Sequence, residues 1–257
     1  MKIISYNLNG IRAALKKDLA HWINDFNADI YCFQELKANT EDIDSSIFTN
    51  LGYETYWFSA EKKGYSGVGI ISKDIKWESV KLGNGYVQSD FEGRVIVAEH
   101  QNFILINAYF PSGTSGNERQ SYKYQWLDEF YNFIQQKILI KKPIIITGDY
   151  NIAHTEIDIH DPKGNKNTSG FLPEERDWMT KFLNLGLTDS FRYKNPETND
   201  GYTWWSQRFP AVRLQNKGWR IDYICVSNSL QTTLEKAFIL PQVKHSDHCP
   251  LGIEWTL

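Results

Sequence analysis

The sequence has few cysteines, no long apolar run and no excess of either charge. Its three cysteines stand singly, without the spacing of a zinc site or the density of a disulfide-rich domain. The first residues turn polar too early for a signal-peptide core, and no apolar stretch reaches the roughly 18 residues of a membrane span. These absences exclude a disulfide scaffold and a membrane helix, and they predict a protein of the reducing cytoplasm.

The overall charge does not by itself indicate a polyanionic partner. Lys and Arg total 28 against 31 Asp and Glu, which gives a formal net charge of -3. Hydrophobic residues make up 41% and charged residues 23%, proportions typical of a folded protein. Because no linker or repeat divides the chain, we expect one domain over residues 1–257.

Short β-rich runs alternate with a few helical patterns, which is typical of the α/β class. Apolar spacing predicts helices over residues 15–26 and 127–138, and a third helix begins at Pro173. The expected strands are 2–7, 30–34, 68–72, 95–99, 103–109, 143–147, 221–227 and 251–256.

Polar side chains follow several of these strands directly, at the edge where α/β proteins bind ligands. Glu35 follows the strand 30–34 and is either a solvated acid or a ligand of Mg²⁺, which prefers oxygen donors. Asp149 and Asn151 are two residues apart, so their side chains point the same way. Like Asn7, they could instead cap backbone amides in an Asx turn.

A second set of polar residues surrounds the last strands. His248 lies in a turn and is either a structural histidine or the partner of Asp222, which begins an apolar strand and needs a partner if buried. An acid on one imidazole nitrogen would favour the charged form and leave the other nitrogen for an anion. Tyr109 stays protonated at neutral pH and can donate a hydrogen bond to a phosphate. These groups suit phosphate ester hydrolysis, which requires a barrier reduction on the order of 20 kcal/mol, more than one general base supplies.

Taken together, the motifs resemble the exonuclease III and abasic-site (AP) endonuclease family of the endonuclease/exonuclease/phosphatase superfamily. The resemblance implies a DNase I-like, four-layer sandwich in which two packed mixed β-sheets are flanked by helices. The motifs occur in the family's order at residues 5–12 (SYNLNGIR), 34–37 (QELK), 64–69 (GYSGVG), 107–113 (NAYFPSG), 148–154 (GDYNIAH), 218–223 (GWRIDY) and 246–250 (SDHCP).

The resemblance also implies a role for each candidate residue. Glu35 would bind Mg²⁺, with Mn²⁺ as a substitute, and Asp247 with Asn7 or Asn9 would lie nearby as ligands. Asp149 would deprotonate the attacking water with help from Asn151. The remaining catalytic groups would be Asp222, which holds His248 against the scissile phosphate, and Tyr109, which supports the phosphate or the leaving oxygen.

Substrate contacts follow from the same resemblance. Trp204, Trp219 and Ile221 would form an apolar pocket for an extruded abasic sugar, unless these rings are simply core. A nucleotide without its base costs least to extrude from the stack. The residues expected to grip DNA phosphates are Arg12, Lys63 and Tyr65, with further basic groups at Lys16, Lys17, Lys62, Lys163, Lys166, Arg208, Arg213 and Lys217.

One segment departs from the family pattern. Some members carry an arginine that wedges into the duplex after the Y-x-P motif, whereas this chain has residues 114–116 (TSG), so the wedge is not carried over. The expected protein is a monomeric Mg²⁺-dependent DNA repair phosphodiesterase. It would cut 5′ to abasic sites in double-stranded DNA and leave a 3′-hydroxyl, with some 3′ to 5′ exonuclease or cleaning activity at blocked 3′ ends, and without a membrane partner. The alternatives are mainly a 3′ to 5′ exonuclease of the same fold, a non-catalytic DNA-binding module, and a metal-free sugar-processing protein.

Overall fold

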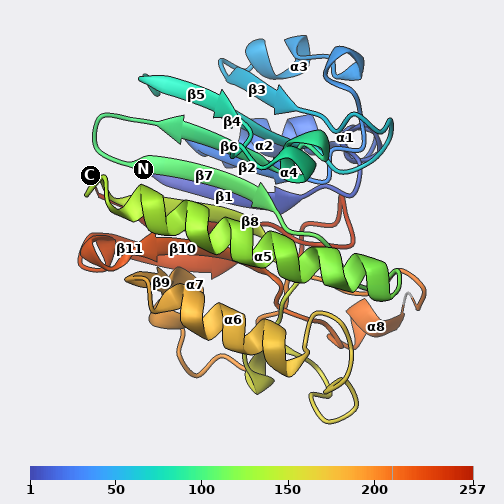
Figure 1. Ribbon diagram of the computed structural model, residues 1–257. Helices are drawn as coiled ribbons and strands as arrows, with labels where there is room; N and C mark the ends of the chain where they lie inside the picture. Colours follow the sequence, from blue (N-terminus) through green and yellow to red (C-terminus); the bar gives the residue numbers. More distant parts are fainter. Residues whose placement is uncertain (210, 257) are drawn as a thin grey trace.

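Two six-stranded sheets face each other across a shared apolar interior (Figure 1). This computed structural model describes residues 1–209 and 211–256. The first sheet has the order β11 (Leu234–Ile239), β12 (Leu251–Trp255), β1 (Lys2–Asn7), β2 (Ile30–Gln34), β4 (Val68–Ser72) and β3 (Glu54–Phe58). The second has the order β5 (Ser79–Leu82), β6 (Val95–Glu99), β7 (Ile104–Tyr109), β8 (Ile144–Asp149), β10 (Asp222–Ser227) and β9 (Leu187–Asp189). Both sheets are mixed, because β1 and β2 are parallel, as are β7 and β8, while other neighbours are antiparallel.

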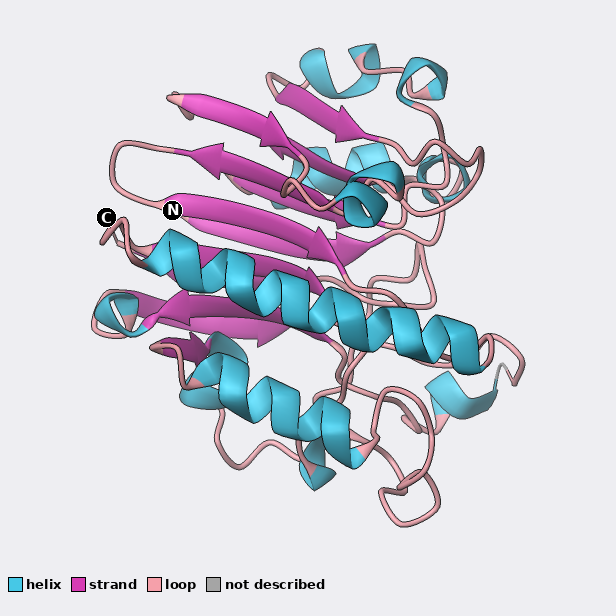
Figure 2. Ribbon diagram, viewed as in Figure 1, coloured by secondary structure: helices cyan, strands magenta, loops and turns pink. Residues whose placement is uncertain are grey.

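Successive side chains of the central strands point to opposite faces of their sheet, so each strand packs against the other sheet on one face and against helices on the other. In β1, Ile3 packs between the sheets, whereas Ile4 packs under the helices of the outer face. In β7, Leu105 faces the opposite sheet and Ile106 faces α5 and α6. Because both faces are covered, these strands read as continuous apolar runs. Figure 2 shows the helices outside the paired sheets, which confirms the expected four-layer, DNase I-like α/β fold.

Helices cover the outer face of each sheet. Helices α5 and α6 pack on the second sheet through Phe130 and Phe182, which belong to its apolar cluster. Helices α1 and α2 pack on the first sheet through Ile11 and Ile23. The α-helices are α1 (Ile11–Leu15), α2 (Leu19–Phe26), α3 (Ser46–Thr49), α4 (Val87–Phe91), α5 (Asn117–Ile138), α6 (Pro173–Leu183), α7 (Ser190–Lys194) and α8 (Ala211–Leu214). Three 3₁₀ turns complete the set: η1 (Thr40–Asp42), η2 (Glu156–Asp158) and η3 (Asn228–Leu230).

Two helix predictions need correction. The helix expected over 15–26 is divided into α1 and α2, because Asp18 adopts a left-handed conformation with φ 74°. Leu15 and Leu19 nevertheless pack into the same apolar cluster. The apolar spacing therefore correctly indicated which side chains share a buried face, although they belong to two helices. The helix expected over 127–138 begins earlier, at Asn117.

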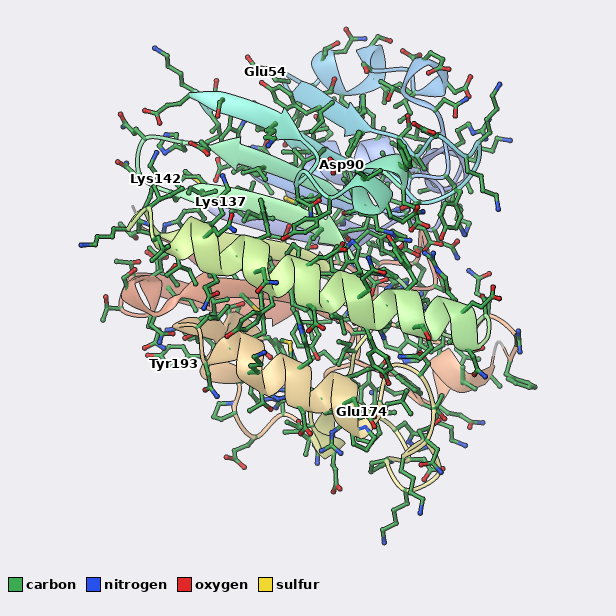
Figure 3. All side chains as sticks on the ribbon, in the orientation of Figure 1. Glu54, Asp90, Lys137, Lys142, Glu174 and Tyr193 are labelled. Atoms are coloured by element: carbon green, nitrogen blue, oxygen red, sulfur yellow. The ribbon has the colours of Figure 1, made fainter. Side chains whose placement is uncertain are left out.

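Both ends of the chain lie at one end of the sandwich. Strand β1 pairs with β12, and the Met1 amino group donates to the Trp255 carbonyl at 2.7 Å. Figure 3 labels Lys137 and Lys142 at this end, where they pair with Glu99 and Glu78. The arrowhead of β7 points to the other end, which therefore receives the polar side chains that follow β7 (Figure 1). Within the described ranges, no helix is long and apolar enough to cross a membrane.

Candidate active site

A pocket of about 380 Å³ opens where the polar strand ends meet. A larger hollow of about 700 Å³, bordered by Trp205 and Arg213, has none of the predicted catalytic residues in its described walls. The smaller pocket is therefore the candidate active site. The residues predicted from the sequence that line it are Asn9, Glu35, Tyr109, Asp149, Asn151, Trp204, Trp219, Ile221, Asp247 and His248.

Strand register brings the acids of this pocket together. Asp149 ends β8 and lies opposite Tyr109 of β7 on one side and Asp222 of β10 on the other. Gly148 allows this approach: its φ is 153°, and a Cβ there would lie 1.8 Å from the Ala108 carbonyl oxygen. Residues separated by tens of positions along the chain thus meet at one sheet edge.

Backbone pairing ties the aromatic wall to the catalytic turn. Trp204 forms isolated β-bridges with both Trp219 and His248. The next amide, that of Trp205, donates to the Asp247 carbonyl at 3.1 Å. The apolar and acidic walls of the pocket are consequently parts of one hydrogen-bonded unit.

Asp149, Asp222 and His248 form a buried acid–histidine cluster. His248 Nδ1 donates to Asp222 Oδ2 at 2.9 Å, and its Nε2 lies 3.8 Å from Asp149 Oδ2. Burial alone would lower the pKa of His248, but the Asp222 and Asp149 carboxylates raise it to about 10. His248 is therefore an imidazolium at neutral pH, with Nε2–H directed toward the second acid.

Asp149 has the opposite balance of effects. Burial and the neighbouring Asp222 raise the pKa of Asp149 to about 7, although the His248 charge and hydrogen bonds from the Asn151 amide and the Asn7 side chain lower it. A carboxyl that titrates near neutrality can accept a proton from water, which suits a general base. Asn7 is fully buried, and its Oδ1 accepts from the Asn9 amide, so it supports Asp149 and does not line the pocket.

Oxygen donors suitable for a hard cation also line the pocket. Asp247 accepts from Asn9 Nδ2 at 2.8 Å and from Trp204 Nε1 at 3.1 Å. The Lys37 ammonium lies 2.9 Å from Glu35 Oε1 and donates to Asn9 Oδ1. A cationic group thus already sits among these oxygens, so the residues fit a divalent ion such as Mg²⁺. Asp149, Asp222 and His248 also lie close enough to hold an ion, but a protonated imidazole is not a metal ligand.

Four of the residues that line the pocket have a left-handed backbone. Asn9, Glu35, Lys37 and Asn151 all line the pocket and all have positive φ, between 47° and 56°. Residues other than glycine rarely adopt this region, and such strain gathers at functional sites. The left-handed backbone conformation that directs these four side chains into the pocket therefore costs conformational free energy.

A network of charged and aromatic groups fixes Tyr109. Arg94 Nη1 donates to the Tyr109 carbonyl at 2.7 Å, and its guanidinium lies 4.9 Å from the centre of the tyrosine ring. Glu92 pairs with Arg94 and with Arg119, which donates to the Tyr65 hydroxyl at 2.6 Å. Burial raises the pKa of Tyr109, so its hydroxyl stays protonated and can donate into the pocket.

Known proteins share both the sequence and this architecture. The profile of the endonuclease/exonuclease/phosphatase family matches residues 4–248. The chain belongs to this family. It is 42% identical to an exodeoxyribonuclease of Bacillus subtilis over 98% of both chains. It is 39% identical to a DNA-(apurinic or apyrimidinic site) endonuclease of Dictyostelium discoideum, over 98% of this chain and 70% of that one.

Solved structures of family members superpose over the whole chain. An AP endonuclease from Archaeoglobus fulgidus matches with a TM-score of 0.92 at 29% identity, covering 100% of both chains. The 3′ phosphatase NExo from Neisseria, bound to a product DNA hairpin, matches equally well at a TM-score of 0.92, 29% identity and 100% of both chains. The resemblance to exonuclease III and AP endonucleases is confirmed, as is the prediction that the chain is an enzyme of this family. Family members depend on a divalent metal, and the oxygen donors of Glu35, Asn9 and Asp247 in the pocket can hold one.

Some predicted substrate residues lie outside the pocket of this family member. Arg12 and Lys63 are exposed, and the Tyr65 hydroxyl accepts from Arg119 and from Arg94, which in turn contacts Tyr109 of the pocket. Arg213 was expected to grip DNA phosphates. Its guanidinium instead stacks on Trp205 and donates to the carbonyls of residues 241, 243 and 246, so it fixes the segment that leads to Asp247.

Other pocket residues escaped the sequence analysis. Lys37 belongs to the motif 34–37, but its ion pair with Glu35 depends on a left-handed backbone that the sequence does not reveal. The loop Thr168–Gly170 forms part of the pocket wall and carries no catalytic residue type that would mark it. Lys123, which does not line the pocket, did give a signal in the sequence, because it lies three and four residues before Trp126 and Leu127 and interrupts the apolar face of α5.

Proposed function

We propose that this enzyme is a Mg²⁺-dependent phosphodiesterase of DNA repair that cuts the backbone 5′ to abasic sites and leaves a 3′-hydroxyl. A secondary 3′ to 5′ exonuclease or 3′-end cleaning activity acts at blocked 3′ ends. One observation carries the proposal: a single pocket places the acid–histidine cluster beside the apolar wall of Trp204, Trp219 and Ile221. The names of the similar proteins support action on DNA.

The acid–histidine cluster supplies the proton transfers and the phosphate contact. Asp149 accepts a proton from water as the water oxygen attacks phosphorus, and the P–O3′ bond breaks on the opposite side. His248 donates from Nε2 to a non-bridging phosphate oxygen, because Asp222 holds its other nitrogen. Tyr109 donates its hydroxyl to the phosphate or the leaving oxygen. Prepositioned donors of this kind stabilise the charge that develops in the transition state.

Glu35 and Asp247 would hold the metal, with Asn9 beside them. A bound Mg²⁺ supplies positive charge that polarises the phosphate. Asn7 supports this site indirectly, since its side chain hydrogen-bonds Asp149. The oxygen-only donor set favours a hard ion such as Mg²⁺ or Mn²⁺ over softer divalent ions.

The aromatic wall supports selectivity for a missing base. Trp204 and Trp219 meet edge to face, with ring centroids 6.1 Å apart, and pack with Ile221. A sugar without its base can enter such a small apolar pocket, and its extrusion costs less unstacking free energy than that of an intact nucleotide. Arg12, Lys63 and Tyr65 would contact phosphates without reading sequence.

The direct test uses a duplex with one abasic site, incubated with Mg²⁺ or with a chelator. We expect strand cleavage with Mg²⁺ only, and the upstream product should be extended by a DNA polymerase because it ends in a 3′-hydroxyl. An intact duplex of the same sequence is the control. Equal cleavage with chelator would contradict the metal mechanism, and a product that cannot be extended would contradict cleavage on the 5′ side.

A family member that acts mainly as an exonuclease is the closest alternative, since one relative is named an exodeoxyribonuclease. Comparing the abasic duplex with an intact recessed 3′ end separates the two. Binding without cleavage in both Mg²⁺ and Mn²⁺ would indicate a non-catalytic DNA-binding module. Family membership disfavours a metal-free sugar-processing protein, which would resist the chelator.

The proposal includes the molecule's setting. We treat residues 1–257 as one domain that acts as a monomer on double-stranded DNA in the reducing cytoplasm, associated with the nucleoid. Three buried free thiols, Cys32, Cys225 and Cys249, support a reducing compartment. Light scattering during size-exclusion chromatography tests the monomer, which a mass of twice 29.9 kDa would contradict.

A further inference from the structure

Lys123 of α5 and Glu175 of α6 form an ion pair that is completely enclosed. Both side chains are 0% exposed, and Lys123 Nζ lies 2.6 Å from Glu175 Oε1. Burying two charges removes their hydration, and a well-packed apolar pair of similar volume is often at least as stable. Fold stability alone therefore does not explain why this ion pair lies on an otherwise apolar helix face. The other hydrogen bonds of Lys123 and Glu175 indicate a further role.

Lys123 is bonded to the turn that carries the proposed general base. Its Nζ donates to the Asn151 carbonyl at 2.8 Å. The Asn151 amide in turn donates to Asp149 Oδ1 at 2.8 Å, and Asn151 has a left-handed φ of 52°. The ammonium is thus two hydrogen bonds from the Asp149 carboxylate and holds a strained turn.

Glu175 is bonded to the loop Thr168–Gly170, which lines the pocket beside that turn. Its Oε2 accepts from the Gly170 amide at 2.6 Å and from the Leu172 amide at 3.1 Å. A Cβ at Gly170 would lie 3.0 Å from the Trp219 ring and 3.2 Å from the Asn151 carbonyl oxygen. Gly170 therefore fits closely between the catalytic turn and the aromatic wall, and one carboxylate fixes its position.

We propose that Lys123 and Glu175 are positioning residues which hold the turn Asp149–Asn151 and the loop Thr168–Gly170 at a fixed separation, and thereby set the preference for a substrate that enters the pocket. This inference rests on the proposed function and adds to it the origin of the preference for abasic DNA. Cleavage at any scissile phosphate needs the turn. Only a substrate that occupies the pocket also needs the loop against Trp219.

The main variant is the double replacement Lys123→Met with Glu175→Leu, which removes both charges and keeps an apolar interior. We expect it to fold, with cleavage of an abasic duplex reduced about 10- to 100-fold, because displacement of reacting groups by about 1 Å can cost that much. Exonuclease cleavage of an intact recessed 3′ end should fall less. The ratio of abasic to recessed-end kcat/KM should consequently drop at least about 5-fold.

Ile134→Ala is the matched control. Ile134 lies on the same helix about three turns beyond Lys123, is completely buried in the core, and does not line the pocket. It should lower the thermal midpoint without changing the activity ratio. A folded double variant with the wild-type ratio would overturn the proposal, as would an equal change of ratio in Ile134→Ala.

Glu175→Gln provides a second measurement if the double variant does not fold. Its amide oxygen can still accept from Gly170, but the buried Lys123 charge is left without its partner. We expect both activities to fall together and the Asn151 turn, rather than the Gly170 amide, to lose protection from hydrogen exchange. Unchanged exchange throughout residues 149–151 and 168–172 would overturn the proposal. If the wild-type enzyme cuts neither substrate with Mg²⁺, the proposed function itself fails, which is a different result from a variant that keeps the wild-type ratio.

Discussion

Two groups of equally buried carboxylates in this protein have opposite acidities. Asp149 is 2% exposed and Asp158 is 1% exposed. In the acid–histidine cluster, two carboxylates share one imidazolium, and burial with the nearby Asp222 raises the pKa of Asp149 to about 7. Burial also acts on Asp158, but two guanidiniums outweigh it and hold the pKa of Asp158 well below its usual range.

The second group, which we call the arginine cluster, consists of Asp158, Asp189, Arg192 and Arg220. Arg220 Nε lies 2.8 Å from Asp158 Oδ1, and its Nη2 lies 2.7 Å from Asp189 Oδ2. Arg192 adds a contact of 2.6 Å to Asp158. Each acid is matched by a cation, so this cluster stabilises the fold, whereas the acid–histidine cluster has one positive charge too few and can take up a proton.

Replacing Asp149 by Asn should have the largest effect. The loss of a general base predicts a decrease in the cleavage rate of about 10²- to 10⁴-fold. DNA affinity should persist, because a negative charge near the phosphate is removed. The thermal midpoint should not fall, since a carboxyl with a raised pKa is destabilised by burial. Steady-state kinetics, binding titration and thermal unfolding measure the three quantities, and a parallel collapse of affinity would make Asp149 structural.

The same substitution in the arginine cluster should act on stability. Asp158→Asn leaves Arg220 without a buried partner charge, and we expect a loss of about 3–5 kcal/mol in the free energy of unfolding. Denaturant titration measures this loss. The protein that remains folded should cleave abasic DNA within a few-fold of the wild-type rate. A loss below about 1 kcal/mol would show that the two clusters do not differ in the way described.

Asp247 offers a sharper comparison, because it lies in the pocket and yet has a lowered pKa. Burial is outweighed by His248 and by hydrogen bonds from Asn9 and Trp204. Trp204→Phe removes the indole donor from Asp247, and we expect about a 10-fold higher Mg²⁺ concentration for half-maximal cleavage. Trp205→Phe is the matched control, since that indole donates to Asn216 instead. Equal shifts in both variants would refute the role of the Trp204 hydrogen bond.

The smallest effect concerns stability in acid. Burial raises the pKa of Glu92, but hydrogen bonds and charges from Arg119 and Arg94 lower it to about 2 from an ordinary 4.5. Because the folded pKa is the lower one, the stabilisation is fully present above about pH 4.5 and is lost as the pH falls toward 2. Glu92→Gln should lose on the order of 1–2 kcal/mol at neutral pH. Thermal midpoints of wild type and variant should converge on acidification, and a constant gap would contradict this account.

The sequence predicted the interior of each sheet and missed its borders. The runs 2–7, 30–34, 68–72 and 95–99 coincide with β1, β2, β4 and β6. The strands that it missed are β3, β5, β9 and β11, and these are the outermost strands of the two sheets. Central strands are apolar on both faces, whereas edge strands such as β5 carry exposed polar residues and resemble loops. Nor could apolar runs reveal which strands share a sheet.

For the pocket, residue types and strand ends were predictable from the sequence, but the contacts between the side chains were not. Asp149 ends β8, Asp222 begins β10 and Glu35 follows β2 of the other sheet, so the motifs placed each acid at a strand end. The pairing of Asp149 with Asp222 and Tyr109 depends on a strand register that the motifs do not reveal. The interrupted apolar face of α5 marks Lys123 in the sequence, but the bonds of Lys123 to the Asn151 carbonyl and of Glu175 to the Gly170 amide could not be predicted. Every residue has a main-chain carbonyl and, proline apart, a main-chain amide, so residue type does not indicate which of these groups accepts or donates such a bond.

The pairing of β1 with β12 makes the chain almost circular. The Met1 amine and the Trp255 carbonyl are 2.7 Å apart, on the side of the molecule away from the pocket. A short peptide could join the two ends, and the polypeptide could be opened at the exposed turn after α5, where Leu139 is 76% exposed. Such a permutant would make β8 its first strand and place α5 last, with every pocket residue in its present position.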